Sequence, residues 1–482
     1  MRAGVNASGV ALDDGQRGWT YAELDSEVER LAGRLQAQKT RVIATLLDNS
    51  PAWVFADLAA ARAGTVHVPL PAFFTPEQID HALGAAGVDT VITLPGMAAR
   101  WPQAPASECV VAGQALSMLR LAAAAVPMPA GTAKITFTSG TTGVPKGVCL
   151  GADAMRQVAQ GLVLAMEPLD IRRHLCALPF AVLLENIAGL MAPLARGAAC
   201  VALPLQQLGL RGSSSFDAAR FHAAVLAQQP HSIIVLPQML RVWAGYLALS
   251  GQRAPGTLKL VAVGGAAVGA KLIGAARSLG IPAYEGYGLS EGASVQTLNL
   301  PGADHPGSAG RALPHSQLRV ARDGEVEVSG SLFGGYLGDA AAPPLAWWPT
   351  GDLGEIDADG FLHIRGRKKH LLITAFGRNV SPEWVETALR SDNALAQAVV
   401  FGDAQPALSA VLWPVRPDAA DVALQAAVDA ANAALPDYAR VRRWVRGRVD
   451  FNAETGMATA NGRPQRAAIL QLHHDALVTA AA

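Results

Sequence analysis

The stretch Lys134-Ile-Thr-Phe-Thr-Ser-Gly-Thr-Thr-Gly-Val-Pro-Lys-Gly-Val148 carries the strongest structural signal in the chain. Its apolar residues from Ile135 to Phe137 predict a β-strand, which leads into a run of hydroxyl and glycine residues from Thr138 to Gly143. Glycines let backbone N–H groups approach an anion, hydroxyls add donors, and Lys146 adds a positive charge. The run therefore suits a triphosphate or a pyrophosphate. Its spacing does not fit a Walker A loop, and composition alone leaves an ordinary polar loop as an alternative.

Helix and strand patterns alternate on both sides of this stretch, up to about residue 310. Helical spacing of apolar residues, with Thr20 as N-cap, predicts a helix from Ala22 to Leu35. This alternation predicts parallel sheets covered by helices, and hence an α/β fold. The other expected helices are Pro51 to Arg62, Gln78 to Ala86 and Ala267 to Leu279, and the expected strands are Val42 to Leu47, Val66 to Leu70, Thr90 to Thr93, Ser232 to Leu236, Leu258 to Val263 and Ile281 to Tyr284.

The pattern changes after Ser308, where short strands separated by Asp-Gly turns predict a small antiparallel β unit. A basic cluster from Gly366 to Lys369 then marks a boundary. The remaining residues mix helix and strand and are numerous enough for a core of their own. We therefore expect a large N-terminal domain over residues 1–366, a hinge at 367–369 and a smaller α+β domain over residues 370–482.

The composition indicates a folded chain and gives no support to binding of nucleic acid. The chain has 482 residues, of which 51% are hydrophobic and 16% charged, and its formal net charge is +0. This balance supplies large cores and no basic surface for nucleic acid. The four cysteines fit neither metal-binding spacing nor a disulfide framework, and are expected to be buried thiols. The sequence shows no signal peptide and no uninterrupted apolar span, so a cytoplasmic protein without a transmembrane segment is expected.

Thr138 to Gly147 matches the pattern T-S-G-T-T-G-x-P-K-G and resembles the phosphate loop of the acyl-adenylate-forming (AMP-binding) superfamily. Further segments resemble the signatures of that superfamily in their expected order: Tyr284 to Glu291, Gly324 to Gly330, Thr350 to Leu353, Gly366 to Lys369 and Gly377 to Glu383. Asn49 to Trp53 and Phe73 to Pro76 look like the early part of fatty acyl-CoA ligases. The resemblance covers essentially the whole chain. It implies stacked α/β sheets with a small β-barrel unit, followed by a mobile C-terminal domain.

The resemblance also implies a reaction in two steps, with ATP, Mg²⁺ and a thiol acceptor, either CoA or a phosphopantetheine arm. Glu291 corresponds to the Mg²⁺ ligand and is expected to be catalytic, as are Lys146 and Thr142. Lys369 corresponds to the hinge residue, and Gly377 to the loop that borders the thiol channel. The implied ATP- and AMP-binding residues are Thr138, Ser139, Gly140, Thr141, Thr142, Gly143, Lys146, Gly265, Ala266, Glu285, Gly286, Tyr287, Gly288, Ser290, Asp352 and Arg367.

Arg463 is a departure from the superfamily pattern. It stands where members usually have a lysine that bridges the carboxylate and the α-phosphate. Arginine keeps the positive charge and can grip two oxygens, but it is bulkier and planar. We expect Arg463 to be catalytic in place of the lysine. The alternative is a nucleotide-binding pseudoenzyme that has lost adenylation.

The segment from Leu178 to Asn186 is expected to border the acyl pocket, with Phe180, Val182 and Gly264 lining it. Its aliphatic side chains favour an apolar acid, preferably a fatty acid, over an amino acid. The expected function is therefore ATP-dependent activation of a hydrophobic carboxylic acid and transfer to a thiol such as CoA. Transfer to an acyl carrier protein or another nucleophile remains an alternative. A serine hydrolase is a further one, because Gly288 to Gly292 fits G-x-S-x-G. The acid, the pathway and the oligomeric state stay open.

Overall fold

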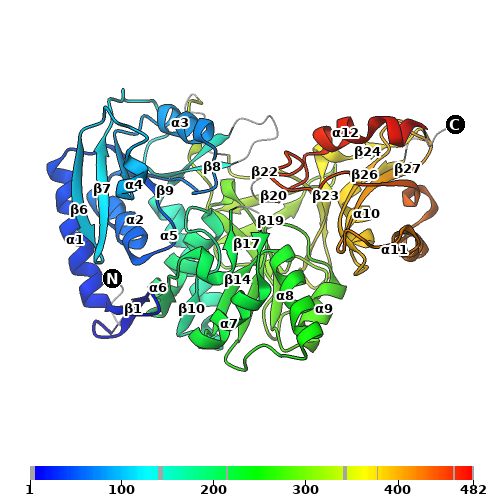
Figure 1. Ribbon diagram of the computed structural model, residues 1–482, viewed down its shortest axis with the longest axis horizontal. Helices are drawn as coiled ribbons and strands as arrows, with labels where there is room; N and C mark the ends of the chain where they lie inside the picture. Colours follow the sequence, from blue (N-terminus) through cyan, green and yellow to red (C-terminus); the bar gives the residue numbers. More distant parts are fainter. Residues whose placement is uncertain are drawn as a thin grey trace.

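The computed structural model describes residues 6–138, 145–212, 215–339, 345–376, 378–459 and 462–479. The part before Arg367 is built around two large sheets with helices against them, and the remaining part packs at the opposite end from the N-terminus (Figure 1). The α/β architecture predicted from the alternating pattern is confirmed. No helix within these ranges combines the length and apolar character that a membrane crossing requires.

The phosphate-loop stretch belongs to an eight-stranded sheet in the order β21-β9-β8-β4-β3-β5-β7-β6. Parallel pairing joins β8 to β4, β4 to β3 and β3 to β5, while β9 runs antiparallel to β8. The strands are β3 (Val42–Leu46), β4 (Val66–Pro69), β5 (Thr90–Thr93), β6 (Ala106–Val111), β7 (Gln114–Arg120), β8 (Thr132–Thr138), β9 (Lys146–Gly151) and β21 (Gly335–Tyr336).

A second sheet of nine strands has the order β18-β17-β16-β15-β14-β10-β11-β1-β2. Its centre, from β16 to β1, is parallel, and antiparallel strands lie at its ends. The strands are β1 (Val10–Asp13), β2 (Gly18–Thr20), β10 (Arg173–Leu175), β11 (Ala199–Val201), β14 (Ser232–Val235), β15 (Leu260–Val263), β16 (Ala283–Leu289), β17 (Ser294–Leu298) and β18 (Arg311–Ala312).

Local sequence signals explain where the helices begin and end. Helix α1 (Tyr21–Ala37) starts with a capping box, in which Thr20 and Glu23 bond to each other's backbone N–H groups. Helix α2 (Pro51–Ala63) is capped by Ser50 and ends at Gly64, whose φ of 70° favours glycine. The other helices of this part are α3 (Pro76–Ala85), α4 (Pro95–Ala98), α5 (Ala152–Ala165), α6 (Ala192–Arg196), α7 (Ala218–Gln228), α8 (Pro237–Ser250) and α9 (Ala270–Ser278).

Two segments differ from the expected elements. Strand β16 continues to Leu289, because Gly288 lets β17 approach so closely that a Cβ there would lie 2.2 Å from the Ser294 carbonyl oxygen. The buried segment after β10 contains a π-helix, η2 (Glu185–Met191), which α6 continues. Cys109, Cys149, Cys176 and Cys200 are buried free thiols, as predicted.

The antiparallel β unit consists of β19 (Ser316–Val320), β20 (Glu325–Gly330), β22 (Trp348–Ile356) and β23 (Leu362–Arg367), paired in that order. An isolated bridge between Arg311 and Phe361 links it to the nine-stranded sheet. The C-terminal part has a separate apolar core under a three-stranded sheet. Its elements are β24 (Leu372–Ile373), β25 (Asn379–Val380), α10 (Pro382–Leu389), β26 (Leu395–Phe401), β27 (Leu408–Pro414), α11 (Asp421–Ala434), β28 (Val441–Arg446) and α12 (Arg466–Thr479).

Candidate active site

The two sides of the phosphate-loop stretch meet at the end of the eight-stranded sheet. Thr138 is the last residue of β8 and pairs with Lys146, the first residue of β9. The residues between them predicted to bind phosphate, Ser139, Gly140, Thr141, Thr142 and Gly143, lie outside the described residues. The Lys146 ammonium lies 5.5 Å from the centre of the Tyr336 ring, on the neighbouring strand β21.

Tyr336 connects this lysine to the predicted metal ligand. Its hydroxyl donates to Glu291 Oε1 at 2.7 Å, and the Glu291 carbonyl oxygen accepts from the Phe333 N–H at 2.8 Å. Burial and the Glu291 carboxylate together raise the pKa of Tyr336, so the tyrosine stays a donor at neutral pH. Sequence reasoning missed Tyr336. The one sequence feature that points to Tyr336 is its place shortly after the Gly324 to Gly330 segment, which resembles a superfamily signature.

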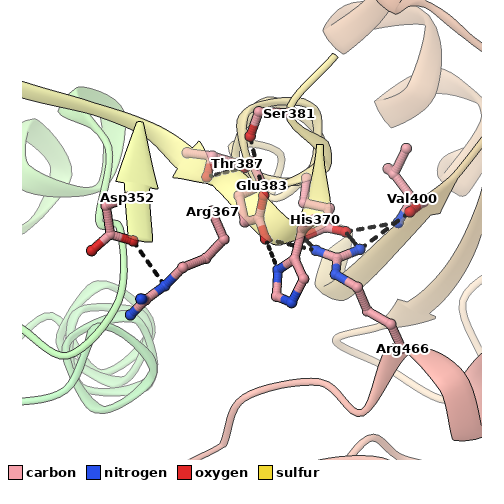
Figure 2. Close-up of polar contacts among 9 residues, drawn as sticks. Asp352, Arg367, His370, Ser381, Glu383, Thr387, Val400 and Arg466 are labelled. Atoms are coloured by element: carbon pink, nitrogen blue, oxygen red, sulfur yellow. Dashed lines mark hydrogen bonds and ion pairs between the residues drawn. The ribbon is translucent and has the colours of Figure 1, made fainter. Parts of the chain in front are cut away.

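Tyr287, Asp352 and Arg367 form one polar group from three strands. The Tyr287 hydroxyl donates to Asp352 Oδ2 at 2.6 Å, and Arg367 Nε lies 2.8 Å from Asp352 Oδ1, as Figure 2 shows for the arginine. Burial raises the pKa of Asp352, against the opposing pull of Arg367 and Tyr287. Burial, reinforced by Asp352, also raises the pKa of Tyr287. The structure therefore brings together three residues that lie far apart in the sequence.

The loop predicted to border the purine follows β15 and includes Gly264, Gly265 and Ala266. Gly265 has φ of +89°, a conformation that favours glycine. Glu285 holds the far end of this loop, because its Oε1 accepts from the Val268 N–H at 3.0 Å. Burial raises the pKa of Glu285 to about 7. Its second oxygen, Oε2, is buried and has no partner among the described residues.

Ser290 begins the short 3₁₀ turn η4 (Ser290–Gly292), directly after the glycines at 286 and 288. A hydrolase triad would need a histidine beside Ser290. In the described part of the chain, the four histidines between positions 291 and 370 have other partners: His305 and His363 contact Asp357, His370 contacts Glu383, and His315 contacts the Val295 carbonyl oxygen. The geometry gives the G-x-S-x-G match no catalytic support.

Arg463 lies on a loop of the C-terminal part, near enough to Asp352 for the two charges to interact. The surrounding protein and then Arg367 lower its pKa, while Asp352, Glu291 and Tyr287 oppose that shift. Arg463 in turn stabilises the ionised form of Asp352. The predicted catalytic arginine thus shares an electrostatic environment with the predicted metal ligand and the predicted ribose ligand, although no direct bond to either is present among the described contacts.

The Glu383 cluster lies in the C-terminal part, beside its junction with the N-terminal part, and consists of Glu383, His370, Ser381 and Arg466 (Figure 2). Glu383 accepts from His370 Nδ1 at 2.5 Å and from the Ser381 hydroxyl at 3.1 Å, and it pairs with Arg466 at 3.4 Å. Although burial opposes it, these partners lower the pKa of Glu383 to about 2.

The predicted hinge residue, Lys369, lies in the turn η5 (Lys368–His370) that enters this junction. Burial and then Arg367 lower its pKa. The Glu383 cluster packs directly against the end of β23, since a Cβ at Gly366 would lie 1.8 Å from Ser381 Oγ. Gly377, predicted to border the thiol channel, lies outside the described residues.

The predicted acyl-pocket residues separate into two groups. Gly264 lies between β16 and the segment from Leu178 to Asn186, because a Cβ there would lie 3.4 Å from the Gly286 carbonyl oxygen and 3.8 Å from Leu184 Cδ2. Val182 is half-buried on that segment. Phe180 instead packs in another apolar cluster, with its ring centre 5.1 Å from that of Trp53. Its packing supports a role in holding the segment and gives no support to contact with an acid.

A scan of family models matches residues 2–335 to the AMP-binding enzyme family and residues 369–480 to the AMP-binding enzyme C-terminal domain. The chain belongs to the AMP-binding enzyme family. The resemblance stated from the sequence motifs is therefore confirmed.

Curated relatives of this AMP-binding enzyme include CoA ligases of several kinds. The long-chain-fatty-acid–CoA ligase FadD15 of Mycobacterium bovis is 35% identical over 244 residues, which cover 45% of this chain. The match spans only 41% of that relative's length. Feruloyl-CoA synthase of an Amycolatopsis species is 28% identical over 436 residues, covering 84% of both chains.

Solved structures share the fold over almost the full length. The o-succinylbenzoate CoA synthetase MenE of Bacillus subtilis, solved with its acyl-adenylate intermediate, has a TM-score of 0.77 at 24% identity and covers 96% of both chains. The anthranilate CoA ligase AuaEII, solved with anthranoyl-AMP, has a TM-score of 0.80 at 20% identity and covers 100% of this chain and 96% of its own. At these identities the likeness concerns the fold alone.

Proposed function

We propose that this chain is an AMP-forming acid–CoA ligase. One observation supports the proposal most directly. Tyr287, Asp352 and Arg367 form a single polar group, and Arg463 of the C-terminal part approaches that group. This arrangement offers a carboxylate and a guanidinium for the ribose and the phosphates of a nucleotide. The named CoA ligases among the relatives support the acid and the acceptor.

In the first step, a carboxylate oxygen attacks the α-phosphorus of ATP, the bond to the bridging oxygen of the β-phosphate breaks, and pyrophosphate leaves with the electron pair. Positioning and charge neutralisation are what such a step needs from the protein. Lys146 attracts the phosphates, Asp352 accepts from the ribose hydroxyls, and Arg463 approaches the carboxylate and the α-phosphate. Glu291 suits Mg²⁺, which takes one or two carboxylates together with phosphate oxygens, and the ion would neutralise the phosphate charge.

In the second step, the thiol of CoA loses its proton to solvent and attacks the acyl carbon, and AMP leaves with the oxygen that joined it to the acyl group. Arg463 has to withdraw so that the thiol can enter. We assign this movement to rotation of residues 370–482 about the hinge at 367–369, relative to residues 1–366. Lys369 and the adjoining Gly366 form the pivot that we propose, and we assign Gly377 to the border of the thiol channel.

A hydrophobic carboxylic acid, preferably a fatty acid, is the proposed substrate. The aliphatic segment around Val182 and the similarity to a long-chain-fatty-acid–CoA ligase support this choice. A panel of fatty, aryl and succinylbenzoate-type acids tests it, with the acyl-AMP trapped as a hydroxamate. The proposal predicts the highest kcat/KM for fatty acids; a preference for aryl acids would contradict it.

Two alternatives share the same site. Transfer to an acyl carrier protein would use the same adenylate, so CoA and a phosphopantetheinyl carrier should be compared as acceptors at equal concentration. The proposal predicts acid-dependent thioester formation with CoA. The second alternative is a pseudoenzyme, and only the arginine at position 463 favours it. A pseudoenzyme would bind ATP but release no pyrophosphate with any acid.

A further inference from the structure

A second cluster of chemically active side chains lies away from the nucleotide site, in the interior of the nine-stranded sheet. His174 on β10, Cys176 just after it and Glu185 at the start of the π-helix η2 are all buried. Their nitrogen, sulfur and oxygen atoms lie within 4.8 Å of one another. Cys200 of the adjacent strand β11 pairs in register with His174. The proposed ligase reaction uses none of these four residues.

The donors of this cluster face one another. His174 Nε2 lies 3.2 Å from Glu185 Oε1, and the thiol of Cys200 contacts that of Cys176. Both thiols also approach the Gly189 carbonyl oxygen, at 3.5 Å from Cys176 and 3.7 Å from Cys200. The cluster therefore brings one imidazole, one sulfur and one carboxylate together, with the Cys200 thiol beside the sulfur of Cys176.

Outer contacts hold these donors in orientations that suit metal coordination. His174 Nδ1 bonds the Ser232 hydroxyl at 2.8 Å, which leaves Nε2 directed at the cluster. Glu185 Oε2 accepts from the Leu178 N–H at 3.2 Å, which leaves Oε1 directed inward. Metal-binding imidazoles and carboxylates in proteins are generally oriented by such second contacts. A cluster that is buried only by apolar packing would not need both of these outer hydrogen bonds.

A buried carboxylate needs a counter-charge, and Glu185 has none from a basic side chain. Within the described ranges its polar partners are the His174 ring, the Leu178 N–H and the Cys176 thiol, and no lysine or arginine pairs with it. Burial raises the pKa of Glu185 and so favours its neutral form, whereas a bound cation would stabilise the ionised form. A divalent cation would neutralise the carboxylate together with one thiolate.

We propose that His174, Cys176 and Glu185 bind a Zn²⁺ ion that stabilises the fold. Zn²⁺ takes nitrogen, sulfur and oxygen ligands at about 2.0–2.3 Å, which places tetrahedral donors roughly 3.3–3.8 Å apart. His174 Nε2 and Glu185 Oε1 lie 3.2 Å apart, and the sulfur of Cys176 lies within 4.8 Å of both. Binding replaces the proton of the Cys176 thiol, which passes to solvent.

The backbone comes so close to the donor atoms at Gly189 that a larger residue there would displace them. A Cβ at Gly189 would lie 2.1 Å from Glu185 Oε1 and 2.9 Å from His174 Nε2. The π-helical turn that carries Gly189 and Glu185 is a rare conformation that is frequently found at functional sites. The site would join β10 and β11 to the segment that precedes α6, so its expected effect is on stability.

Metal analysis of the full-length chain tests the proposal without relying on ligase activity. Protein expressed with Zn²⁺ in the medium and desalted should hold about one Zn²⁺ per chain by mass spectrometry. Replacement by Co²⁺ should give thiolate-to-cobalt charge-transfer absorption. Less than about 0.1 Zn²⁺ per chain together with no such absorption in the wild-type protein would overturn the proposal, and this result requires no variant to fold.

Matched variants locate the ion. Cys176→Ser and Glu185→Gln should each lose most of the zinc and the cobalt absorption, whereas Cys109→Ser, at a buried cysteine elsewhere, should keep both. His363→Ala tests the exposed group His305, Asp357 and His363, which could also bind a cation. Zinc that persists in Cys176→Ser and Glu185→Gln but disappears in His363→Ala would contradict the buried site.

Discussion

At the scale of single residues, Tyr336 is the clearest addition to the active site. It bonds Glu291 at 2.7 Å and lies under the Lys146 ammonium, so it orients a carboxylate that we assign to Mg²⁺. Tyr336→Phe keeps the ring and removes this bond. One hydrogen bond to a charged group contributes about 1.5–3 kcal/mol, so the Mg²⁺ concentration for half-maximal activity should rise roughly 10-fold or more.

Titration of Mg²⁺ at saturating ATP and acid measures this effect. Tyr438→Phe, which removes the hydroxyl of an exposed tyrosine in the C-terminal part, is the matched control and should behave as wild type. An unchanged Mg²⁺ dependence in Tyr336→Phe would remove the tyrosine from the metal site.

Glu285 should make the stability of the protein depend on pH near neutrality. Burial raises its pKa from 4.5 to about 7, so the folded protein retains a proton that the unfolded chain releases. This contribution is complete below pH 4.5 and is lost as pH rises through 7, at a cost of about 3 kcal/mol in the free energy of unfolding. Glu285→Gln carries no charge and should gain stability relative to wild type between pH 5 and pH 8.

Thermal unfolding at a series of pH values follows this difference. Glu454→Gln, at an exposed glutamate, should show the same change of stability with pH as wild type. A constant gap between Glu285→Gln and wild type over the whole range would show that Glu285 does not titrate there.

The sequence located most residues of the site but not their contacts. Asp352, Tyr287 and Arg367 were predicted individually from motifs, because the motifs are local. The bond between Tyr287 and Asp352 joins residues 65 positions apart, and that between Tyr336 and Glu291 joins residues 45 positions apart, so no local pattern reports them. The arrangement of the strands decides these contacts.

At the scale of elements, a buried ion pair joins α2 to the strand that leads into the phosphate loop. Lys134 Nζ on β8 lies 2.7 Å from Asp57 Oδ1 on α2, and His67 Nδ1 on β4 lies 2.6 Å from the same oxygen. Burial raises the pKa of Asp57, but Lys134 and His67 outweigh it and lower that pKa overall. Removing one partner of such a pair leaves a buried charge unpaired.

Asp57→Leu should therefore cost about 3–5 kcal/mol in the free energy of unfolding, whereas Asp57→Leu combined with Lys134→Met should recover most of that loss. Denaturant unfolding of the two single variants and the double variant measures the coupling. Strictly additive losses in the double variant would mean that the two charges do not stabilise each other.

The elements that sequence patterns predicted best are those with both periodicity and end signals. Helix α1 has helical spacing and the cap at Thr20, and it appears close to its expected place. Strand β16 was expected to end at Tyr284, because Gly286 and Gly288 interrupt its apolar pattern; close approach of β17 extends it. The π-helix η2, which begins at Glu185, has no periodic pattern in the sequence that distinguishes it from an α-helix.

At the scale of the whole molecule, the Glu383 cluster ties His370, which directly follows the hinge, to α10 and α12 of the C-terminal part, and it packs against Gly366 at the end of β23. Glu383→Gln weakens the pairing with His370 and Arg466, so the hinge end of this part is held less firmly and the orientation in which Arg463 approaches the nucleotide site should be less populated. Acyl-AMP formation should slow about 2- to 10-fold, as expected for the loss of about 0.5–1.5 kcal/mol. Transfer from preformed acyl-AMP to CoA should not slow.

Separate assays of the two half-reactions distinguish these effects, with Glu454→Gln as the control. Equal slowing of both half-reactions would indicate a general loss of structure and would contradict a role in orientation.

Acid-dependent pyrophosphate release by the full-length chain tests the central claim most directly. Wild-type protein with ATP, Mg²⁺ and a panel of carboxylic acids should release pyrophosphate and form AMP with at least one acid, without orthophosphate. Arg463→Ala should reduce that rate at least about 10-fold, because a charge-assisted contact to the reacting groups is lost. No pyrophosphate with any acid, or the same rate in Arg463→Ala, would contradict the account.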